Sequence, residues 1–236
     1  MSDANTTPHV VITGAAGALG RAVAQHFLEQ GARLALIDHH AGRLAEVFPG
    51  LDNSQHLLLA GDVTSAPEMA ELLTGQVLKA FGRVDALVHI AGGFEMGEAT
   101  HALSRTSWDR MMNLNAWSFV AVTQAVLPSM IERKAGRIVA VTAKVATRGL
   151  PAMAAYIASK SALQRLVEAM AAEAAPHGVS VNSVAPSVLD TPANRQAMPD
   201  ANPAEWVSTS VAAQTIGFLA SPAAAALHGQ HLTLDT

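Results

Sequence analysis

Apolar residues along the chain follow two different periods. Short runs such as His9–Thr13 and Arg33–Asp38 are almost continuously apolar, as in strands that are buried on both faces. Longer Ala-rich stretches between them, such as Leu19–Glu29, repeat apolar residues at helical spacing. The predicted strands are His9–Thr13, Arg33–Asp38, His56–Ala60, Val84–Ile90, Gly136–Thr142, Val179–Ala185 and His231–Leu234; the predicted helices are Leu19–Glu29, Ala41–Val47, Pro67–Phe81, Trp108–Arg133, Ala155–Ala175 and Val211–Ala220, with a loop over Asp190–Trp206.

Alternation of strands and helices indicates one α/β fold. Apolar strands separated by helices are typical of a parallel sheet covered on both faces. We therefore expect a doubly wound, Rossmann-type sheet of about seven strands in a single domain, residues 1–236, with residues 1–8 as a flexible tail. Such sheets bind ligands at the carboxyl ends of their strands.

Composition narrows the function classes. Half of the residues are hydrophobic, 14% are charged and the formal net charge is −4, so we expect no nucleic-acid partner. The chain has no cysteine and its first residues lack the basic and apolar parts of a signal peptide, which favours a cytoplasmic location. The uncharged stretch Met111–Ile131 contains Asn113 and Asn115, and therefore we expect no membrane span.

The first predicted strand runs into a glycine-rich loop, Gly14–Gly20. Gly14 permits a tight turn, the small residues Ala16, Gly17 and Ala18 let the backbone approach a pyrophosphate, and Gly20 after Leu19 lets the helix pack closely on the strand. The free N–H groups at the helix start favour bound phosphate. The position of this loop between a strand and a helix predicts a dinucleotide site.

Asp38 ends the second predicted strand, eighteen residues after Gly20. A carboxylate there can accept both hydroxyls of an adenosine ribose and repels an additional 2′-phosphate. The next two residues are His39 and His40 rather than Arg or Lys. The sequence therefore favours NAD(H) over NADP(H).

Tyr156 and Lys160 are separated by one helical turn and should lie on the same helix face. A phenol has an ordinary pKa near 10, and a neighbouring cation stabilises the phenolate. Together with the dinucleotide loop, the pair indicates a proton-transfer site next to a nicotinamide.

Together these residues resemble the short-chain dehydrogenase/reductase family over essentially the whole chain. Further marks are Gly61-Asp62-Val63 after the third strand, Ala91-Gly92 after the fourth, Asn115, and Pro186 to Thr191 after the sixth. The resemblance implies that Asp62 and Val63 contact the adenine and that Lys160 also holds the nicotinamide ribose. It further implies that Asn115 supports a proton relay, so that the catalytic set is Tyr156, Lys160 and Asn115. The cofactor residues expected in total are Gly14, Ala16, Gly17, Ala18, Leu19, Gly20, Asp38, Asp62, Val63, Ala91, Gly92, Gly93, Tyr156, Lys160, Pro186, Ser187, Leu189 and Thr191.

One departure from the family pattern concerns the catalytic serine. The family's serine lies 13 residues before the tyrosine, where this chain has Ala143. Thr142 is adjacent, but successive strand residues face opposite ways. Loss of such a donor costs about a hundredfold in rate or more, which makes an ordinary ketone less suitable as substrate.

A branch of the family that reduces quinonoid dihydropterins also has Ala followed by Lys at this position, as in Ala143-Lys144. The chain is similar to that branch in the Gly92-Gly93 pair, in the loop Leu189–Pro199 and in Trp206 soon after it. The resemblance implies hydride transfer from NADH to a conjugated pterin ring.

Two alternatives remain open at this stage. One is a carbonyl reductase or alcohol dehydrogenase that uses another donor, and the other is a dinucleotide-binding sensor that has lost catalysis. No His-x-x-x-His spacing occurs, so we expect no bound metal. The two long apolar helices, 108–133 and 155–175, pair between subunits in the family, so a homodimer or homotetramer acting on a small molecule is expected.

Overall fold

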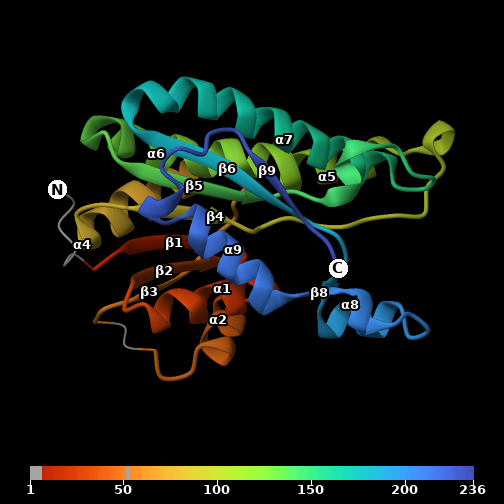
Figure 1. Cartoon of the computed structure of the whole chain (residues 1–236), viewed down its shortest axis with the longest axis horizontal. Helices are drawn as coiled ribbons and strands as arrows, with labels where there is room; N and C mark the ends of the chain where they lie inside the picture. Colours follow the sequence, from red (N-terminus) through yellow and green to blue (C-terminus); the bar gives the residue numbers. More distant parts are fainter. Residues whose placement is uncertain (1–6, 52–53) are drawn as a thin grey trace.

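A computed structural model describes residues 7–51 and 54–236. Seven parallel strands form one sheet in the order β3-β2-β1-β4-β5-β6-β9 (Figure 1). The chain order reverses between β1 and β4, which places the crevice of a doubly wound sheet at their carboxyl ends. The strands are β1 (His9–Thr13), β2 (Arg33–Asp38), β3 (Leu57–Ala60), β4 (Ala86–His89), β5 (Gly136–Val141), β6 (Val179–Pro186) and β9 (His231–Leu234). The predicted fold class is confirmed.

Helices cover both faces of this sheet. Helices α1 (Ala18–Glu29), α2 (Ala41–Val47) and α9 (Thr209–Leu219) lie on one face (Figure 1). The other face is covered by a helix that is continuous over α3 (Ala66–Met69), η1 (Ala70–Leu78) and α4 (Lys79–Phe81), by another continuous over α5 (Arg105–Met112), η3 (Asn113–Trp117) and α6 (Ser118–Arg133), and by α7 (Ala154–Ala174). The segments η1 and η3 are π-helical.

The two cores explain why the strands read as continuous apolar runs. Val10 and Ile12 of β1 pack into the core with α1 and α9, while Val11 between them packs into the core with α6 and α7. All three are at most 1% exposed. Because side chains alternate along a strand, burial on both faces requires apolar residues at nearly every position.

Capping residues shift three of the predicted helix starts; one is that of α9, which was predicted from Val211 and begins at Thr209, where the Ser208 hydroxyl accepts from the Val211 backbone. The helix predicted from Trp108 begins at Arg105 because the Ser104 hydroxyl accepts a hydrogen bond from the Ser107 backbone. The helix predicted from Pro67 begins at Ala66, where Ser65 makes the same kind of cap.

The loop predicted over Asp190–Trp206 is wrong in part. The segment begins with Asp190, the second residue of a two-residue strand. It then contains helix α8 (Pro192–Ala197) and a short 3-10 helix, η6 (Pro203–Glu205). The Thr191 hydroxyl accepts a hydrogen bond of 3.2 Å from the Asn194 backbone, and Pro192 occupies the first turn, where a missing N–H costs nothing. Strand β7 (Leu189–Asp190) pairs with β8 (Val207–Ser208) and closes this segment.

The helix Arg105–Arg133 is long and apolar enough to cross a membrane by length and composition. Half of its most apolar window is buried within the protein, and its Asn115 is fully buried. These features fit a core helix of the domain. Of the predicted tail, residues 1–6 lie outside the described residues, and Thr7 and Pro8 are exposed.

Candidate active site at the carboxyl ends of the strands

The glycine loop is held against the fourth strand. Gly14 has a φ of +68°, and a β-carbon there would lie 2.8 Å from the backbone nitrogen of Ala91. At Gly20, the first-turn glycine of α1, a β-carbon would lie 2.2 Å from the Gly14 carbonyl oxygen. Both positions therefore exclude any side chain, as expected for a loop that turns tightly under a helix N-terminus.

Asp38 is bound to this loop from the second strand. The backbone N–H of Ala16 donates a hydrogen bond of 3.0 Å to Oδ2 of Asp38. The carboxylate thus holds the loop in place, and one of its two oxygens already accepts a hydrogen bond from the protein. Asp38 therefore lies against the glycine loop, and its contact with a ribose remains a prediction.

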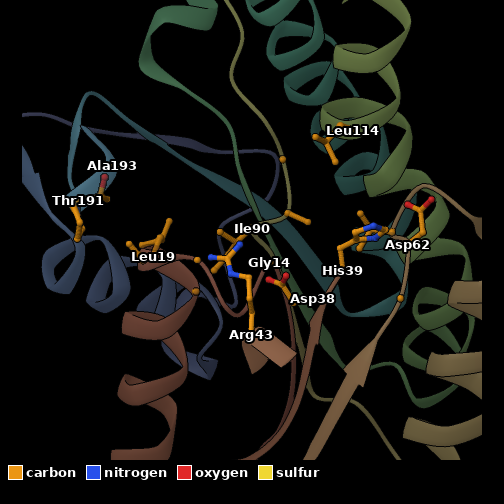
Figure 2. Close-up of a pocket in the computed structure, with 18 residues that line it drawn as sticks. Gly14, Leu19, Asp38, His39, Arg43, Asp62, Ile90, Leu114, Thr191 and Ala193 are labelled. Atoms are coloured by element: carbon orange, nitrogen blue, oxygen red, sulfur yellow. The ribbon is translucent and has the colours of Figure 1, made fainter. Parts of the chain in front are cut away.

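These elements surround a cavity of about 690 Å³ (Figure 2). Eleven of the predicted cofactor residues line it: Gly14, Gly17, Ala18, Leu19, Gly20, Asp38, Asp62, Val63, Ala91, Gly92 and Thr191. Asp62 is oriented by Thr64, whose backbone N–H and hydroxyl both donate to Asp62 Oδ1 at 2.9 and 2.8 Å. The cavity thus joins the ends of the first four strands to the segment after β6.

The other predicted cofactor residues lie outside this cavity wall. Ala16 bonds to Asp38 through its backbone, Gly93 bonds to Asn115, and Pro186 ends strand β6. Ser187 donates from its backbone to Leu234, and Leu189 belongs to β7. Tyr156 and Lys160 lie on the neighbouring helix α7.

Seven lining residues were missed in the sequence: His39, Arg43, Gly61, Ile90, Leu114, Pro192 and Ala193. Most of them are next to a predicted residue in the sequence, and this adjacency is the signal that could have identified them. Arg43 differs, because it lies five residues beyond Asp38 on helix α2. Side chains in a first helical turn tilt toward the helix N-terminus, which here lies beside the end of β2.

Tyr156 and Lys160 lie one turn apart near the start of α7. Lys160 is 5% exposed, and its ammonium donates a hydrogen bond of 2.8 Å to the carbonyl of Val141 at the end of β5. Burial lowers the pKa of Lys160 to about 8 and raises the pKa of Tyr156 to about 12. The lowered phenol pKa that the pair suggested is therefore wrong for the protein alone: burial dominates, and Tyr156 is a neutral proton donor.

Asn115 connects this helix to the loop after β4. It is fully buried, its Oδ1 accepts from the Gly93 backbone at 2.9 Å, and its Nδ2 donates to the Gly93 carbonyl and to the Ser159 hydroxyl, each at 3.0 Å. A β-carbon added at Gly92 would lie 2.7 Å from Asn115 Oδ1 and 3.1 Å from Lys160 Nζ. Asn115 and Lys160 therefore both lie next to Gly92, which lines the cavity.

His89 supports the site from beneath. It is 1% exposed, and burial lowers its pKa to about 3, with the charge of Lys160 adding to the effect. Its ring bonds Thr13 Oγ1 at 2.9 Å and Ser118 Oγ at 3.0 Å. The histidine is therefore a neutral core residue next to the site.

Ala143 leaves the family's serine position without a hydroxyl. The adjacent Thr142 is 3% exposed, and its hydroxyl donates to the carbonyl of Val184 at 3.2 Å within the sheet. Its hydroxyl is therefore directed toward strand β6. The ammonium of Lys144 forms an ion pair with Asp235, and so it is directed to the last strand.

An apolar rim stands next to Tyr156. The Phe94 ring meets the Tyr156 ring edge to face, with centroids 4.9 Å apart, although Phe94 itself is 59% exposed. Met96, in the same loop, is 60% exposed, and Gly97 donates from its backbone to Ala152 at 2.9 Å. The space beside the reactive phenol is thus bordered by an aromatic face.

The donor set fits a dinucleotide. A β-carbon at Gly14 or Gly20 would meet backbone, so the loop is shaped for close approach, and α1 starts at this loop with its free N–H groups. Within residues 7–51 and 54–236, no group of three or more His, Asp or Glu side chains is arranged to hold a metal.

Comparison with known proteins identifies the family. The family described as short chain dehydrogenase matches residues 8–202. The NAD-dependent glycerol dehydrogenase of Listeria innocua is 30% identical over 99% of this chain and 94% of its own length. The D-threitol dehydrogenase of Mycolicibacterium smegmatis is 32% identical over 95% and 90% of the two chains.

The fold agrees with solved structures. The structure described as ElxO with NADP bound superposes with a TM-score of 0.89 at 23% identity, covering 98% of both chains. The glycine loop and the Tyr156/Lys160 pair both lie within the residues that the family matches. The chain belongs to the short-chain dehydrogenase/reductase family of NAD(P)-binding oxidoreductases.

Proposed function

We propose that this chain is an NADH-dependent reductase of a conjugated ring, with a quinonoid dihydropterin as the type of substrate. The observation that carries the proposal is Ala143 beside an intact Tyr156. Thr142 is turned into the sheet and Lys144 is paired with Asp235. Neither therefore replaces the hydroxyl that polarises an ordinary ketone.

A quinonoid ring has less need of that hydroxyl. When bound, NADH supplies a hydride to the electron-poor ring, whose conjugated nitrogens share the negative charge that would otherwise fall on a single oxygen. One proton must then be added to give the tetrahydro form and NAD⁺. Tyr156, whose pKa is raised to about 12, holds that proton at neutral pH. Lys160, with its pKa near 8, is mostly protonated at neutral pH, and its positive charge favours return of a proton to Tyr156 after the reaction.

Phe94 supports a planar substrate. Its ring is 59% exposed yet touches Tyr156 edge to face. An exposed aromatic ring beside a proton donor provides a surface on which a flat heterocycle can stack. Preference for NADH is supported by Asp38, since its carboxylate repels a 2′-phosphate.

A second candidate is an alcohol or carbonyl oxidoreductase. The named relatives are a glycerol dehydrogenase and a D-threitol dehydrogenase, both of which act on alcohols by name. This candidate requires another hydrogen-bond donor to the substrate oxygen in place of the missing serine.

Steady-state rates with NADH and a freshly generated quinonoid dihydropterin, measured beside a panel of ketones, separate these functions. The proposal predicts pterin turnover and weak ketone turnover. Ketone turnover without pterin turnover supports the alcohol–carbonyl candidate, and NADH binding with no turnover on either class supports a sensor.

Ala143→Ser sharpens the same assay. Restoring a hydroxyl should raise ketone reduction by about tenfold or more and leave pterin reduction nearly unchanged. Equal effects on both substrates would contradict our explanation of Ala143.

We also propose that two copies associate through helices α5–α6 and α7, in the cytoplasm. Trp108 and Trp117 are 36% and 44% exposed on the first of these, and large exposed aromatic residues favour an interface. Trp117→Glu should shift the mass measured by light scattering toward the monomer; an unchanged mass would count against this surface. Cell fractionation tests the location.

A further inference from the structure

A series of hydrogen bonds, here called the His89 network, runs behind the wall of the dinucleotide cavity. It begins at the backbone N–H of Ala91, which donates to Thr13 Oγ1 at 3.3 Å. Thr13 Oγ1 lies 2.9 Å from Nδ1 of His89, whose Nε2 lies 3.0 Å from the hydroxyl of Ser118. That hydroxyl donates to the carbonyl of Leu114 at 2.7 Å. Both ends of the network, Ala91 and Leu114, belong to residues that line the cavity (Figure 2).

The available hydrogens give the His89 network a single direction. A hydroxyl has one hydrogen to donate, and Ser118 uses it on the Leu114 carbonyl, so Ser118 must accept from Nε2 of His89. Thr13 already accepts a backbone N–H and keeps its own hydrogen for Nδ1 of His89. Burial, together with the charge of Lys160, lowers the pKa of His89 to about 3. The ring is therefore neutral at neutral pH, with its proton on Nε2.

The network ends inside the π-helical segment η3. The backbone N–H of Ser118 bonds the carbonyl of Asn113, five residues back, while its hydroxyl bonds the carbonyl of Leu114, four residues back. The hydroxyl thus occupies the carbonyl that this N–H would use in an α-helix. Segment η3 carries Asn115, whose side chain bonds Gly93 across the site. The bond from Ser118 therefore helps to hold the wide turn that places Asn115.

The imidazole of His89 is held in one orientation. His89 is 1% exposed, and both of its partners, Thr13 and Ser118, are fully buried. The ring of Phe119 meets it edge to face, with centroids 5.8 Å apart. A rotated ring would present carbon atoms to the two hydroxyls and leave buried polar groups without partners, which is costly. His89 therefore acts as a rigid link between β1 and the helix that carries η3.

We propose that His89 is a positioning residue for the proton-transfer step. Through Ser118 it holds the η3 turn that carries Asn115. Through Thr13 it holds the start of the loop after β4. The inference rests on the proposed reductase function, in which Asn115 supports delivery of the proton. Loss of the imidazole should let η3 shift while the reactive groups themselves stay in the protein, and small displacements of supporting groups slow reactions strongly.

Two substitutions of His89 test this role in the full-length protein. His89→Leu fills the buried site but removes both nitrogens, so the turnover rate should fall by roughly tenfold to a hundredfold, with a much smaller change in NADH affinity. His89→Gln supplies one donor and one acceptor and should recover a large part of the rate. His9→Leu is the matched control, because His9 is also buried, at 9% exposed, but begins β1 at the opposite end of the strand from the cavity.

Nitrogen-15 NMR of the imidazole rings tests the network in the wild-type protein without dinucleotide or substrate. The His89 signals are assigned by their absence from His89→Gln. A proton on Nε2 and none on Nδ1 is expected from pH 5 to pH 9. A proton on Nδ1, or a charged ring in this range, overturns the inference.

The kinetic outcomes separate this inference from the proposed function. Equal turnover by His89→Leu and wild type, or a loss of rate that is matched by an equal loss of NADH affinity, overturns the positioning role and leaves the proposed function intact. If His89→Leu does not fold, Ser118→Ala interrupts the network at the next bond and should give the same selective loss of rate. If the wild type turns over neither a dihydropterin nor a ketone, the proposed function fails, and the positioning role fails with it.

Discussion

The side-chain amide of Asn115 donates a hydrogen bond of 3.0 Å to the hydroxyl of Ser159. Ser159 precedes Lys160, and its own hydroxyl donates to the Tyr156 carbonyl at 2.8 Å. The bond therefore joins the turn that carries both reactive groups to the helix on the opposite side of the site. Because Asn115 also bonds Gly93 through both its amide atoms, it fixes the loop after β4 to α7.

Removal of Asn115 should be much more damaging than removal of Ser159. Asn115→Ala leaves the half-buried N–H and carbonyl of Gly93 without their side-chain partner, at a cost of about 2 kcal/mol. Ser159→Ala leaves Asn115 bonded to Gly93 and should cost about 1 kcal/mol. Urea unfolding of both variants measures the difference; equal losses of unfolding free energy would contradict the role assigned to Asn115.

Two glycines of the loop should separate folding from cofactor binding. A β-carbon at Gly20 would lie 2.2 Å from backbone, so Gly20→Ala should destabilise the protein by about 2 kcal/mol or more. At Gly17 it would have only an ordinary contact at 3.4 Å. Gly17→Ala should therefore fold normally but bind NADH less tightly, because it fills the approach to the pyrophosphate.

Thermal unfolding and NADH titration of both variants provide the measurement. Normal stability in Gly20→Ala would contradict the packing described for the loop. Undiminished NADH affinity in Gly17→Ala would place the pyrophosphate elsewhere.

Lys160 should make stability depend on pH. Burial lowers its pKa from the ordinary 10.5 to about 8. Between these values the unfolded chain binds the additional proton, so the wild-type free energy of unfolding gains a rising contribution as pH increases from 8 to 10.5. The gain amounts to about 3 kcal/mol for this shift. Lys160→Met lacks it, so any stability advantage of that variant should shrink across the same window.

Chemical unfolding at pH 7, 8, 9 and 10 measures this difference, with Lys79→Met as the control at an exposed lysine of α4. A constant difference between Lys160→Met and wild type would show that the ammonium is not strained by burial. Stopping at pH 10 limits the contribution of Tyr156, whose phenol has a pKa near 10 in the unfolded chain and near 12 in the folded protein, and both variants and the wild type contain this residue.

Local spacing predicted much of the fold and site. The apolar runs identified each strand of the main sheet, and the i, i+4 spacing placed Tyr156 and Lys160 one turn apart. Asp38 followed from its position at a strand end, and its bond to Ala16 confirms that it belongs to the loop.

Features that depend on long-range geometry could not be predicted in this way. Arg43 lines the cavity from helix α2, and its guanidinium donates to the Ala16 carbonyl of the glycine loop, a contact between residues 27 positions apart in the sequence. Helix α8 was predicted as a loop because its segment is rich in proline and polar residues, although Thr191 and Pro192 form its cap and first turn. The raised pKa of Tyr156 depends on how deeply α7 packs, and spacing alone suggested the opposite direction.

The most direct test of the account compares Tyr156→Phe with wild type, measuring NADH binding and substrate-dependent NADH oxidation in the same samples. The variant removes one hydroxyl and keeps the ring that Phe94 touches. If Tyr156 delivers the proton, the turnover rate should fall by about a hundredfold or more, while NADH affinity changes far less. An unchanged turnover rate would show that the proton comes from another group, and the central claim would be wrong.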